Sequence, residues 1–515
     1  MSVERRPIAD LSTSWKLKEV LSQGPEPHLM TGEQYKESLR DGRKVIDAEG
    51  NIIEDVVTHP ALKRGIENLA KVYDFQFEEK TKDIATYVDE EDGKRYSVGW
   101  KVPKTKADLR QRRDMLRLST YHTLGVFGRP NDYGSMMAMG FLSIVDIIEK
   151  ENPDSSKTIN NFIEFSKQHN IISADLVPEV QSDRTIPPNE RPSRLRIVED
   201  RPDGVVLSGA KPAASVAAQG HYVTISSSLS PNLDPDAAIW AAVPLNSEGL
   251  TIVLREPVTD PDASFEDHPI DSKGEEIDNL LIFDNVFVPN ELLFSVRNTD
   301  ILGIYRKTGI LAHWHILSRL MYRAEIFSGV AQNIVDILKT DNFQGVRDAV
   351  TEVISYAATL KAFVIAAEEE SEIRNGVLIP STELVTAGRL HSIRKYPEIM
   401  HILRDISGQG LISRFTEKTW NNPLIKDKLD LFLPGTGVTA QEKNRFFNFV
   451  WDLTSGSHAT RVALFENVNS TNAPIIMSQI YTLYDRSEPT SFIRSYLDLP
   501  LDDYEVTQLY DSDLK

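Results

Sequence analysis

The hydrophobic pattern of this chain changes its period twice, and this constrains the possible folds more than any other feature. Up to about residue 170 the apolar residues recur at helical spacing, as they do from Leu62 to Val72. From Ile171 prolines interrupt the chain, and β-branched residues alternate in short runs. Beyond Asn298 the helical period returns in long segments. The pattern predicts an α+β protein with a mainly helical domain (1–170), a β-barrel or sandwich domain (171–298) and a helical bundle with a tail (299–515).

Local signals predict individual elements within these regions. Thr31 and Thr105 stand at capping-box spacing and predict helix starts, and Pro60 suits a first helical turn. The turn Arg201-Pro-Asp-Gly204 between apolar runs predicts a β-hairpin. The first thirty residues are polar and are expected to form an arm that is ordered only against another domain or chain. Further helices are expected over residues 136–150, 158–169, 310–337, 346–369, 381–396, 399–407 and 442–453.

Composition excludes several classes of function. The chain has 515 residues and no cysteine, which excludes disulfides, thiolate metal sites, cysteine nucleophiles and thiolate-bound iron–sulfur clusters, and we expect no metal site. A formal net charge of −19 disfavours nucleic acids and anionic membranes as partners. We see no stretch apolar enough to span a bilayer and no signal peptide at the start, so we expect a cytoplasmic protein.

The stretch from Gly125 to Tyr133 is the first candidate site. Gly128 and Pro130 bracket Arg129 in a turn, so a guanidinium is held on a stiff backbone close to an aspartate and a phenol. This arrangement suits an anionic oxygen. In the alternative interpretation Arg129 and Asp132 pair with each other and Tyr133 only packs.

The motif Gly128-Arg129-x-x-Asp132-Tyr133 resembles that of the two-component, reduced-flavin-dependent aromatic hydroxylases, which include 4-hydroxyphenylacetate 3-monooxygenase and the chlorophenol monooxygenases. The resemblance runs from about Thr31 to about Ser470. In addition, residues 203–211 and 283–289 resemble two segments of the acyl-CoA dehydrogenase superfamily. The resemblance therefore implies an acyl-CoA dehydrogenase-like fold, in which flavin lies between the β domain and the bundle without a glycine-rich fingerprint.

The resemblance also implies an activity. The family uses FADH2 from a separate NAD(P)H:flavin reductase, traps molecular oxygen as a C4a-hydroperoxyflavin and hydroxylates a small phenolic substrate, from which a para substituent could be eliminated. A homotetramer packed through the C-terminal bundle is expected. The alternative is an acyl-CoA dehydrogenase-type flavoenzyme that acts on a CoA thioester, and a non-enzymatic helical scaffold is the third possibility.

The resemblance assigns substrate contacts to Arg129 and Tyr133. An arginine beside a phenol oxygen favours the phenolate, which attacks an electrophilic oxygen donor faster than the phenol does. In His313-Trp-His315 two histidines point in different directions on a helix, and we favour His313 as the base and expect His315 among the substrate contacts. The alternative is a pair that contacts Arg319 or another subunit.

The remaining site residues follow from the resemblance. Arg461 is expected as a catalytic pocket residue, although it could simply pair with Glu466 or Asp452. Asp175 replaces a histidine that touches substrate in relatives, and Ala463 replaces an aromatic, so the identity of the substrate is open. Flavin contacts are expected at Asp175, Leu176, Val177, Pro178, Gln181, Ser215, Ser457, His458, Thr460 and Arg461.

Overall fold

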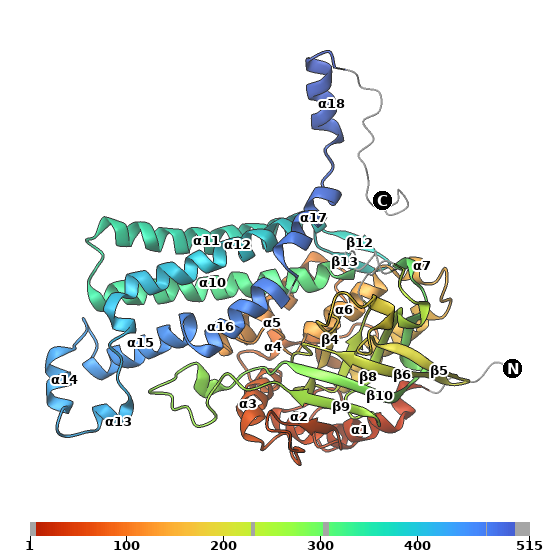
Figure 1. Ribbon diagram of the computed structural model, residues 1–515, viewed down its shortest axis with the longest axis horizontal. Helices are drawn as coiled ribbons and strands as arrows, with labels where there is room; N and C mark the ends of the chain where they lie inside the picture. The colour runs from red at the N-terminus through yellow and green to blue at the C-terminus, as the bar shows by residue number, and fades with distance from the viewer. Residues whose placement is uncertain (1–6, 228–231, 302–307, 470, 500–515) are drawn as a thin grey trace.

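The computed structural model of the chain describes residues 7–227, 232–301, 308–469 and 471–499. Long helices form one side of the molecule, and the β-sheets lie beside them with the first helices of the chain on their outer face (Figure 1). One large cluster of buried apolar side chains includes members from the N-terminal, middle and C-terminal regions. The predicted order of helices, strands and helices is present.

The N-terminal region is mainly helical, and its helices start where the sequence predicts. Capping boxes at Thr31 and Thr105 begin α2 (Gly32–Ser38) and α5 (Lys106–His122), because each threonine side chain accepts a hydrogen bond from the backbone three residues on. Pro60 opens α3 (Pro60–Asp74). The other long helices of this region are α1 (Trp15–Ser22), α6 (Tyr133–Leu142) and α8 (Ser155–His169).

Two predictions in this region are wrong. Residues 7–30 do not form an arm, because α1 buries Leu17, Val20 and Leu21 against the rest of the chain; residues 1–6 of the predicted arm lie outside the described residues. The helix expected over residues 136–150 is broken into α6 and α7 (Val145–Ile148). At the break, the Ser143 hydroxyl donates to the Gly140 carbonyl, a local bond that competes with the regular helix.

The middle region contains two sheets. The five-stranded sheet has the order β1-β9-β10-β6-β5, and the four-stranded sheet has the order β11-β8-β7-β4. The predicted hairpin is formed by β5 (Arg196–Arg201) and β6 (Gly204–Lys211), with Arg201 opposite Gly204. The remaining strands are β1 (Lys44–Ile46), β4 (Ser173–Leu176), β7 (Tyr222–Ile225), β8 (Ile239–Pro244), β9 (Leu250–Leu254), β10 (Asn279–Pro289) and β11 (Leu293–Val296).

One strand of the larger sheet comes from outside the region predicted to be β. Strand β1 lies in the N-terminal region and pairs in parallel with β9, so Val45 lies opposite Ile252. This pairing joins the first helices to the middle sheet through backbone hydrogen bonds. Two short hairpins lie outside these sheets: β2 (Thr86–Val88) with β3 (Arg95–Ser97), and β12 (Glu372–Arg374) with β13 (Val377–Ile379).

The C-terminal region is a bundle in which α10 packs against α11 and α12. Instead of the two helices expected over residues 381–407, α12 runs unbroken through Pro397. Proline lacks one N–H, but here packing against both neighbours outweighs the loss of a single backbone hydrogen bond. The bundle helices are α10 (Ile310–Leu338), α11 (Gln344–Glu369), α12 (Thr382–Ser407), α15 (Ala440–Thr454) and α16 (Ser457–Leu464). Beyond them, α17 (Ala473–Leu483) packs on α12, and α18 (Ser487–Tyr496) projects from the body (Figure 1).

Helix α11 contradicts our expectation that no segment is apolar enough to span a bilayer. Its length and composition suffice for a membrane span, a test that helices packed inside other proteins also pass. In this structure α11 packs between α10 and α12, yet only 33% of its most apolar window is buried. Within the described residues, an apolar face of α11 is therefore left exposed.

Candidate active site

The Arg129 turn is held by a buried carboxylate. The backbone N–H groups of Gly128 and Arg129 donate to the two oxygens of Glu276, each at 2.7 Å. Glu276 has no exposed surface. A Cβ at Gly128 would lie 2.2 Å from a ring carbon of Phe465, so only glycine fits against that ring. The turn therefore has little freedom to move.

The Arg129 side chain lies between two aromatic rings. Its guanidinium carbon is 3.9 Å from the centroid of the Tyr133 ring and 4.6 Å from that of Phe465. The guanidinium of Arg461 also lies 4.6 Å from the Phe465 centroid. The structure thus brings Arg129 and Arg461, which are more than 300 residues apart in sequence, to the same ring.

Asp132 does not pair with Arg129, which was the simpler interpretation of the motif. Instead, Asp132 is 2.9 Å from Nε2 of His315 and 3.8 Å from Nη2 of Arg112. Burial alone would raise the pKa of Asp132, but His315 and Arg112 outweigh burial and lower that pKa. The His315 ring also meets the Tyr133 ring edge-on. His315 therefore contacts two residues of the motif, Asp132 and Tyr133, and helps to fix their positions.

His313 lies on the same helix as His315 but has different neighbours. It is buried, and its Nε2 is 3.3 Å from the Thr471 hydroxyl. Burial and the positive charges of Arg389 and Arg129 lower the pKa of His313 to about 3. An ordinary imidazole titrates near neutral pH and would suit the role of base that the sequence analysis favours for His313, but these surroundings disfavour its protonated form. At neutral pH it is a neutral hydrogen-bond partner and a weak base.

Asp175 lies in β4, next to β7, where the Thr224 hydroxyl donates to it at 3.4 Å. Burial raises the pKa of Asp175 to about 6, although the charges of Arg129 and Lys211 act in the opposite direction. The Tyr133 phenol feels the charges of both Arg129 and Asp175, but burial dominates and raises its pKa. Asp175 therefore lies close enough to Arg129 and Tyr133 for their charges to affect one another.

Arg461 belongs to a network of charges at the edge of the middle sheet. Its guanidinium donates to Glu276 at 2.9 Å and to both oxygens of Asp278 at 2.6 and 2.9 Å. The Ser215 hydroxyl donates to Asp278 at 2.5 Å. The alternative partners that the sequence suggested for Arg461 are wrong: Glu466 binds Arg319, and Asp452 lies near His268. Burial opposes ionisation of Asp278, but Arg461 outweighs it and the pKa of Asp278 is lowered to about 2.

Helix α16 carries the other predicted flavin contacts. Ser457 and Thr460 are exposed in its first turn, and Ala463 is half-buried. His458 is buried, with its Nδ1 at 3.2 Å from Asp271. Within the described residues its Nε2 has no hydrogen-bond partner. A buried ring nitrogen without a partner, beside two exposed hydroxyls and Arg461, fits a ligand with polar edges and negative charge.

The chain that leaves β4 provides the remaining predicted contacts. Leu176 is buried, Val177 and Pro178 are half-buried, and Gln181 is exposed. The Val177 carbonyl accepts a hydrogen bond from Nζ of Lys211 at 3.0 Å, which fixes the start of this segment.

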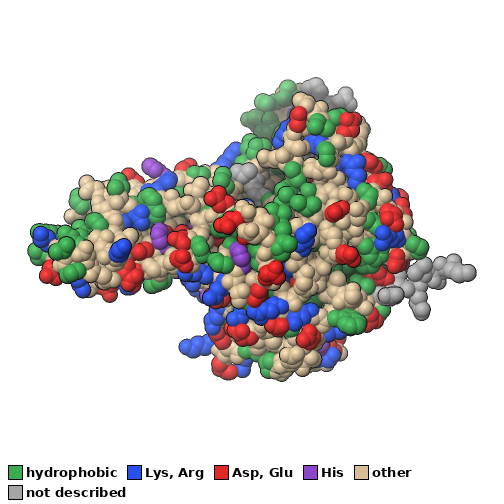
Figure 2. Space-filling model, turned by 60° about the horizontal axis from the view of Figure 1, so that its bottom comes forward, with side chains coloured by type: hydrophobic (Ala, Val, Ile, Leu, Met, Phe, Trp, Pro, Cys, Tyr) green, Lys and Arg blue, Asp and Glu red, His purple; other side chains and the backbone are tan. Residues whose placement is uncertain are grey.

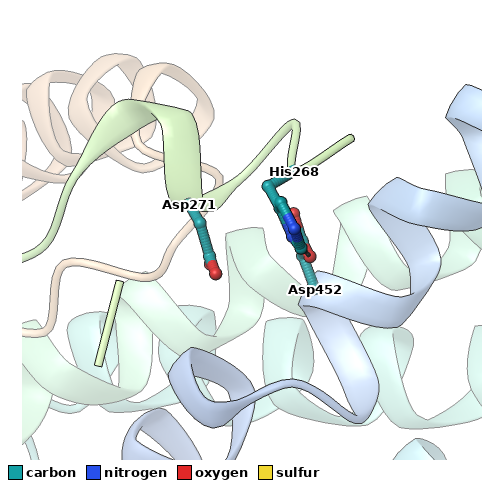
Figure 3. Close-up of side chains that lie close together, drawn as sticks. All are labelled: His268, Asp271 and Asp452. Carbon is teal, nitrogen blue, oxygen red and sulfur yellow. Dashed lines mark hydrogen bonds and ion pairs between the residues drawn. The ribbon is translucent and has the colours of Figure 1, made fainter. Parts of the chain in front are cut away.

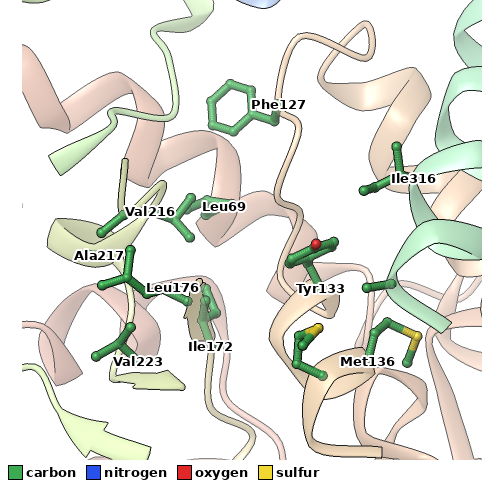
Figure 4. Close-up of a cluster of buried hydrophobic side chains, with 14 of the residues drawn as sticks. Leu69, Phe127, Tyr133, Met136, Ile172, Leu176, Val216, Ala217, Val223 and Ile316 are labelled. Atoms are coloured by element: carbon green, nitrogen blue, oxygen red, sulfur yellow. The ribbon is translucent and has the colours of Figure 1, made fainter. Parts of the chain in front are cut away.

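Buried apolar side chains surround Tyr133. They come from the N-terminal helices, the middle sheet and α10, and several of them flank the space in front of the Tyr133 ring (Figure 4). Such a wall excludes water from neighbouring charges and strengthens their interactions. The labelled members are Leu69, Phe127, Met136, Ile172, Leu176, Val216, Ala217, Val223 and Ile316.

A second polar cluster lies between the loop before β10 and α15. His268, Asp271 and Asp452 each offer a ligand atom, and these atoms lie within 4.8 Å of one another (Figure 3). Asp452 already has partners, because the backbone N–H of Ile270 donates to it at 3.1 Å and His268 Nδ1 is 3.3 Å away. These contacts explain the cluster as a link between loop and helix without a cation.

Sequence reasoning missed the residues that assemble the site. Glu276 and Phe465 connect Arg129 with Arg461, and Asp278 holds Arg461, but none of the three was selected as a candidate. The available signal was the acidic run Glu275-Glu276-Ile277-Asp278 directly before a strand, where acidic residues are unfavourable unless they are paired.

Two family models match the chain. The model described as the 4-hydroxyphenylacetate 3-hydroxylase N terminal matches residues 31–295, and the model described as the C terminal of the same enzyme matches residues 303–498. Together they cover most of the chain.

Curated relatives match along nearly their whole length. The chain is 29% identical over 485 residues to the 4-hydroxyphenylacetate 3-monooxygenase oxygenase component of Thermus thermophilus, which covers 93% of this chain and 99% of that one. It is 28% identical to the 2,4,6-trichlorophenol monooxygenase of Cupriavidus pinatubonensis, covering 86% of this chain and 87% of that one. It is 29% identical to the 4-nitrophenol 4-monooxygenase/4-nitrocatechol 2-monooxygenase oxygenase component of Rhodococcus opacus, covering 88% of each.

Solved structures agree with these matches. The crystal structure of the oxygenase component of 4-hydroxyphenylacetate 3-monooxygenase complexed with FAD and 4-hydroxyphenylacetate has a TM-score of 0.85 and 28% identity, and covers 91% of this chain and 98% of that one. An archaeal 4-hydroxybutyryl-CoA dehydratase has a TM-score of 0.83 at 20% identity, a likeness of fold alone, and covers 92% of this chain and 96% of that one. The predicted acyl-CoA dehydrogenase-like α+β fold is confirmed.

Proposed function

The chain belongs to the 4-hydroxyphenylacetate 3-hydroxylase family, and on this basis we propose that it is the oxygenase component of a two-component monooxygenase that hydroxylates a small phenol. Its co-substrates are FADH2 and molecular oxygen. A separate NAD(P)H:flavin reductase supplies the reduced flavin, as the term oxygenase component implies for its relatives. The alternative reaction on a CoA thioester is not favoured, because the matching family models are those of the hydroxylase.

The observation that carries this proposal is the positive charge beside Tyr133. Arg129 stacks on the Tyr133 ring, and the pKa of His313 is lowered to about 3 mainly by burial and further by the charges of Arg389 and Arg129. The same field stabilises a phenolate whose oxygen lies beside Arg129. His313, neutral at physiological pH, can accept the hydrogen bond of the phenol, but with a pKa of about 3 it is too weak a base to keep the phenol proton.

Reduced FAD, when bound, supplies the electrons that activate molecular oxygen. We assign its binding to Asp175, to the segment from Leu176 to Gln181, to Ser215 and to the start of α16, where Ser457, His458, Thr460 and Arg461 lie. The unpartnered Nε2 of His458 and the Arg461 guanidinium support this assignment. The apolar residues around Tyr133 keep water from the reacting ring.

The substrate remains open within the phenols. Asp175 is acidic where relatives have a histidine, and Ala463 leaves more room than an aromatic would. We propose a phenol with a polar substituent, from which a para halogen or nitro group could be eliminated. The proposed domain boundaries, 1–170, 171–298 and 299–515, put the site where all three domains meet.

We also propose that the protein is a homotetramer in the cytoplasm, where NAD(P)H is available to the reductase. The tetramer would pack through the C-terminal bundle. The exposed apolar face of α11 supports this choice.

The proposal is tested with purified protein, FAD, NADH and a generic flavin reductase. We expect oxygen consumption and a hydroxylated product with at least one of 4-hydroxyphenylacetate, 4-nitrophenol and 2,4,6-trichlorophenol.

Arg129→Ala should lower kcat/KM by about 100-fold or more, the size found when a charge-stabilising donor is removed, and should leave FAD binding unchanged. Arg117→Ala is the matched control, because Arg117 stacks on Tyr121 at 5.2 Å on an exposed face of α5. Absence of product from every phenol, or a full rate in Arg129→Ala, would contradict the proposal.

A further inference from the structure

We propose that Glu276 is a positioning residue that sets the Arg129 turn and couples the phenol site to the cofactor site. This inference rests on the proposed function. Nothing in the motif of the Arg129 turn points to Glu276, which lies 147 residues further along the chain. Its role follows from which atoms its carboxylate contacts.

The Glu276 carboxylate holds three donors at once. Oε1 accepts from the backbone N–H of Gly128 at 2.7 Å and from Nη1 of Arg461 at 2.9 Å, and Oε2 accepts from the backbone N–H of Arg129 at 2.7 Å. All three bonds lie away from solvent, since Glu276 is fully buried. Charged, buried hydrogen bonds of this kind are strong and directional.

These bonds determine where the Arg129 guanidinium lies. The turn lies against Phe465, since a Cβ at Gly128 would come within 2.2 Å of a carbon of that ring. It is held on the other side by Glu276. With the backbone fixed on both sides, the guanidinium stays stacked between the rings of Tyr133 and Phe465. With glutamine at position 276 only one side-chain oxygen remains to accept, so one N–H group of the turn would face an NH2 group and the turn could shift.

The same carboxylate connects the two binding sites. Arg461, which we assign to the cofactor, donates to Glu276 and to Asp278. An anionic cofactor that attracts Arg461 weakens the hydrogen bond between Arg461 and Glu276. This in turn changes the hydrogen bonds that Glu276 accepts from the backbone of the Arg129 turn. The affinity for the phenol then depends on whether FAD is bound, and the affinity for FAD depends on the phenol by the same factor.

The neighbouring Glu275 provides a matched control. It is as buried as Glu276 but points elsewhere: its carboxylate binds Arg255 and the backbone N–H groups of Val258 and Thr259. It has no described contact with the Arg129 turn or with Arg461. Glu275→Gln therefore removes an equally buried charge from the same segment but removes no direct bond to the Arg129 turn or to Arg461, although its partner Arg255 also donates to Asp278 at 3.1 Å.

The test uses 4-nitrophenol, whose phenolate absorbs visible light, so that its binding and ionisation are read together. The full-length protein is titrated anaerobically with and without reduced FAD, which absorbs little in this range and cannot turn over. In the unsubstituted protein we expect bound 4-nitrophenol to be ionised at a lower pH than in solution, and its affinity to change when reduced FAD is present. Glu276→Gln should bind it about tenfold more weakly, as for loss of a charged hydrogen bond, with the ionisation shift and the FAD effect both lost.

The controls separate this inference from the proposed function. Glu275→Gln should keep the affinity within about twofold, in line with an unaffected site. Glu276→Asp keeps the charge on a side chain that is shorter by one methylene group. Its affinity for 4-nitrophenol should therefore lie between those of Glu276→Gln and Glu275→Gln, and it provides a second variant of the same position. If the folded Glu276 variants bind 4-nitrophenol like Glu275→Gln and retain the FAD effect, the role of Glu276 is wrong and the proposed function stands. If the unsubstituted protein binds none of the three phenols, the proposed function itself fails.

Discussion

Asp175 differs from the other acids of the site in its partners. Asp132 has His315 and Arg112 nearby, and Asp278 has Arg461. In the part of the chain that the structure describes, Asp175 has no ion-pair partner within contact distance and accepts instead from the Thr224 hydroxyl. Asp175 keeps some exposed surface, but the removal of its carboxylate from water, with no paired cation, is costly when it ionises and raises its pKa to about 6. The pKa of Asp175 therefore lies closer to neutral pH than the lowered pKa values of Asp132 and Asp278.

Asp175→Asn should stabilise the protein at neutral pH. The folded protein holds the Asp175 proton up to about pH 6, whereas the unfolded chain releases it near 4. The stability that Asp175 contributes is thus present below about pH 4 and is lost as the pH rises through 6. The neutral amide avoids this loss, so we expect a gain of about 1–2 kcal/mol in the free energy of unfolding at pH 7.5 that vanishes near pH 4. Urea denaturation at both pH values measures it.

Asp132→Asn is the control with the opposite sign. The pKa of Asp132 is lowered in the folded protein by His315 and Arg112, against burial. Its contribution is present above its unfolded pKa and is lost as the pH falls. Asp132→Asn should therefore destabilise the protein at pH 7.5. Equal effects of the two variants, or an Asp175→Asn effect independent of pH, would be incompatible with these assignments.

The sequence predicted those elements whose start or end is set by neighbouring residues. It did not predict the elements that depend on contacts with distant parts of the chain. The helix starts at Thr31 and Thr105 were predicted because a capping box lies within four residues. The unbroken α12 was not predicted, because packing by α10 and α11 keeps Pro397 helical. For the same reason the motif residues of the site were found from sequence, whereas Glu276 was not, because its partners lie 147 and 185 residues away.

The largest concentration of buried arginine joins two elements. Arg319 on α10 donates to Glu466 in the π-helical turn η11 (Phe465–Asn469), and both are fully buried. Arg323 and Arg389 are also buried, and their charges act on Glu466. Burial would raise the pKa of Glu466, but the three arginines outweigh burial and lower it. A single carboxylate thus offsets several positive charges where the bundle meets the end of α16.

Glu466→Gln should destabilise the fold by about 3–5 kcal/mol, the usual cost of leaving one partner of a buried ion pair uncompensated. Urea denaturation at pH 7.5 measures the loss. Glu37→Gln is the control, because Glu37 pairs with Lys16 on the surface with 45% of its side chain exposed. Such a pair is worth at most about 1 kcal/mol. Comparable losses of unfolding free energy in the two variants would show that Glu466 is not needed to compensate the charges of the buried arginines.

At the scale of the whole molecule, apolar surface is concentrated on the C-terminal helices. Ile354 and Ile365 of α11 are 52% and 41% exposed, and α18 buries none of its residues within the described chain. The bundle extends away from the sheets, and α18 projects in a different direction, beyond α17 (Figure 1). On the face shown in Figure 2 acidic and basic side chains are interspersed, which does not resemble the continuous basic stripe of a nucleic-acid binder. Exposed apolar side chains on these helices suit association between copies of the chain.

If the α11 face packs against other copies, charge on that face should break the assembly. We expect the unsubstituted protein to sediment as a tetramer at micromolar concentration and the double variant Ile354→Asp/Ile365→Asp to sediment as smaller species, because aspartate buried in an apolar interface lacks a partner. Ile52→Asp is the matched control, since Ile52 is 62% exposed in the N-terminal region, away from the bundle. Sedimentation velocity separates the cases. A double variant that remains tetrameric would show that the interface does not involve the α11 face. A monomeric unsubstituted protein would contradict the tetramer itself.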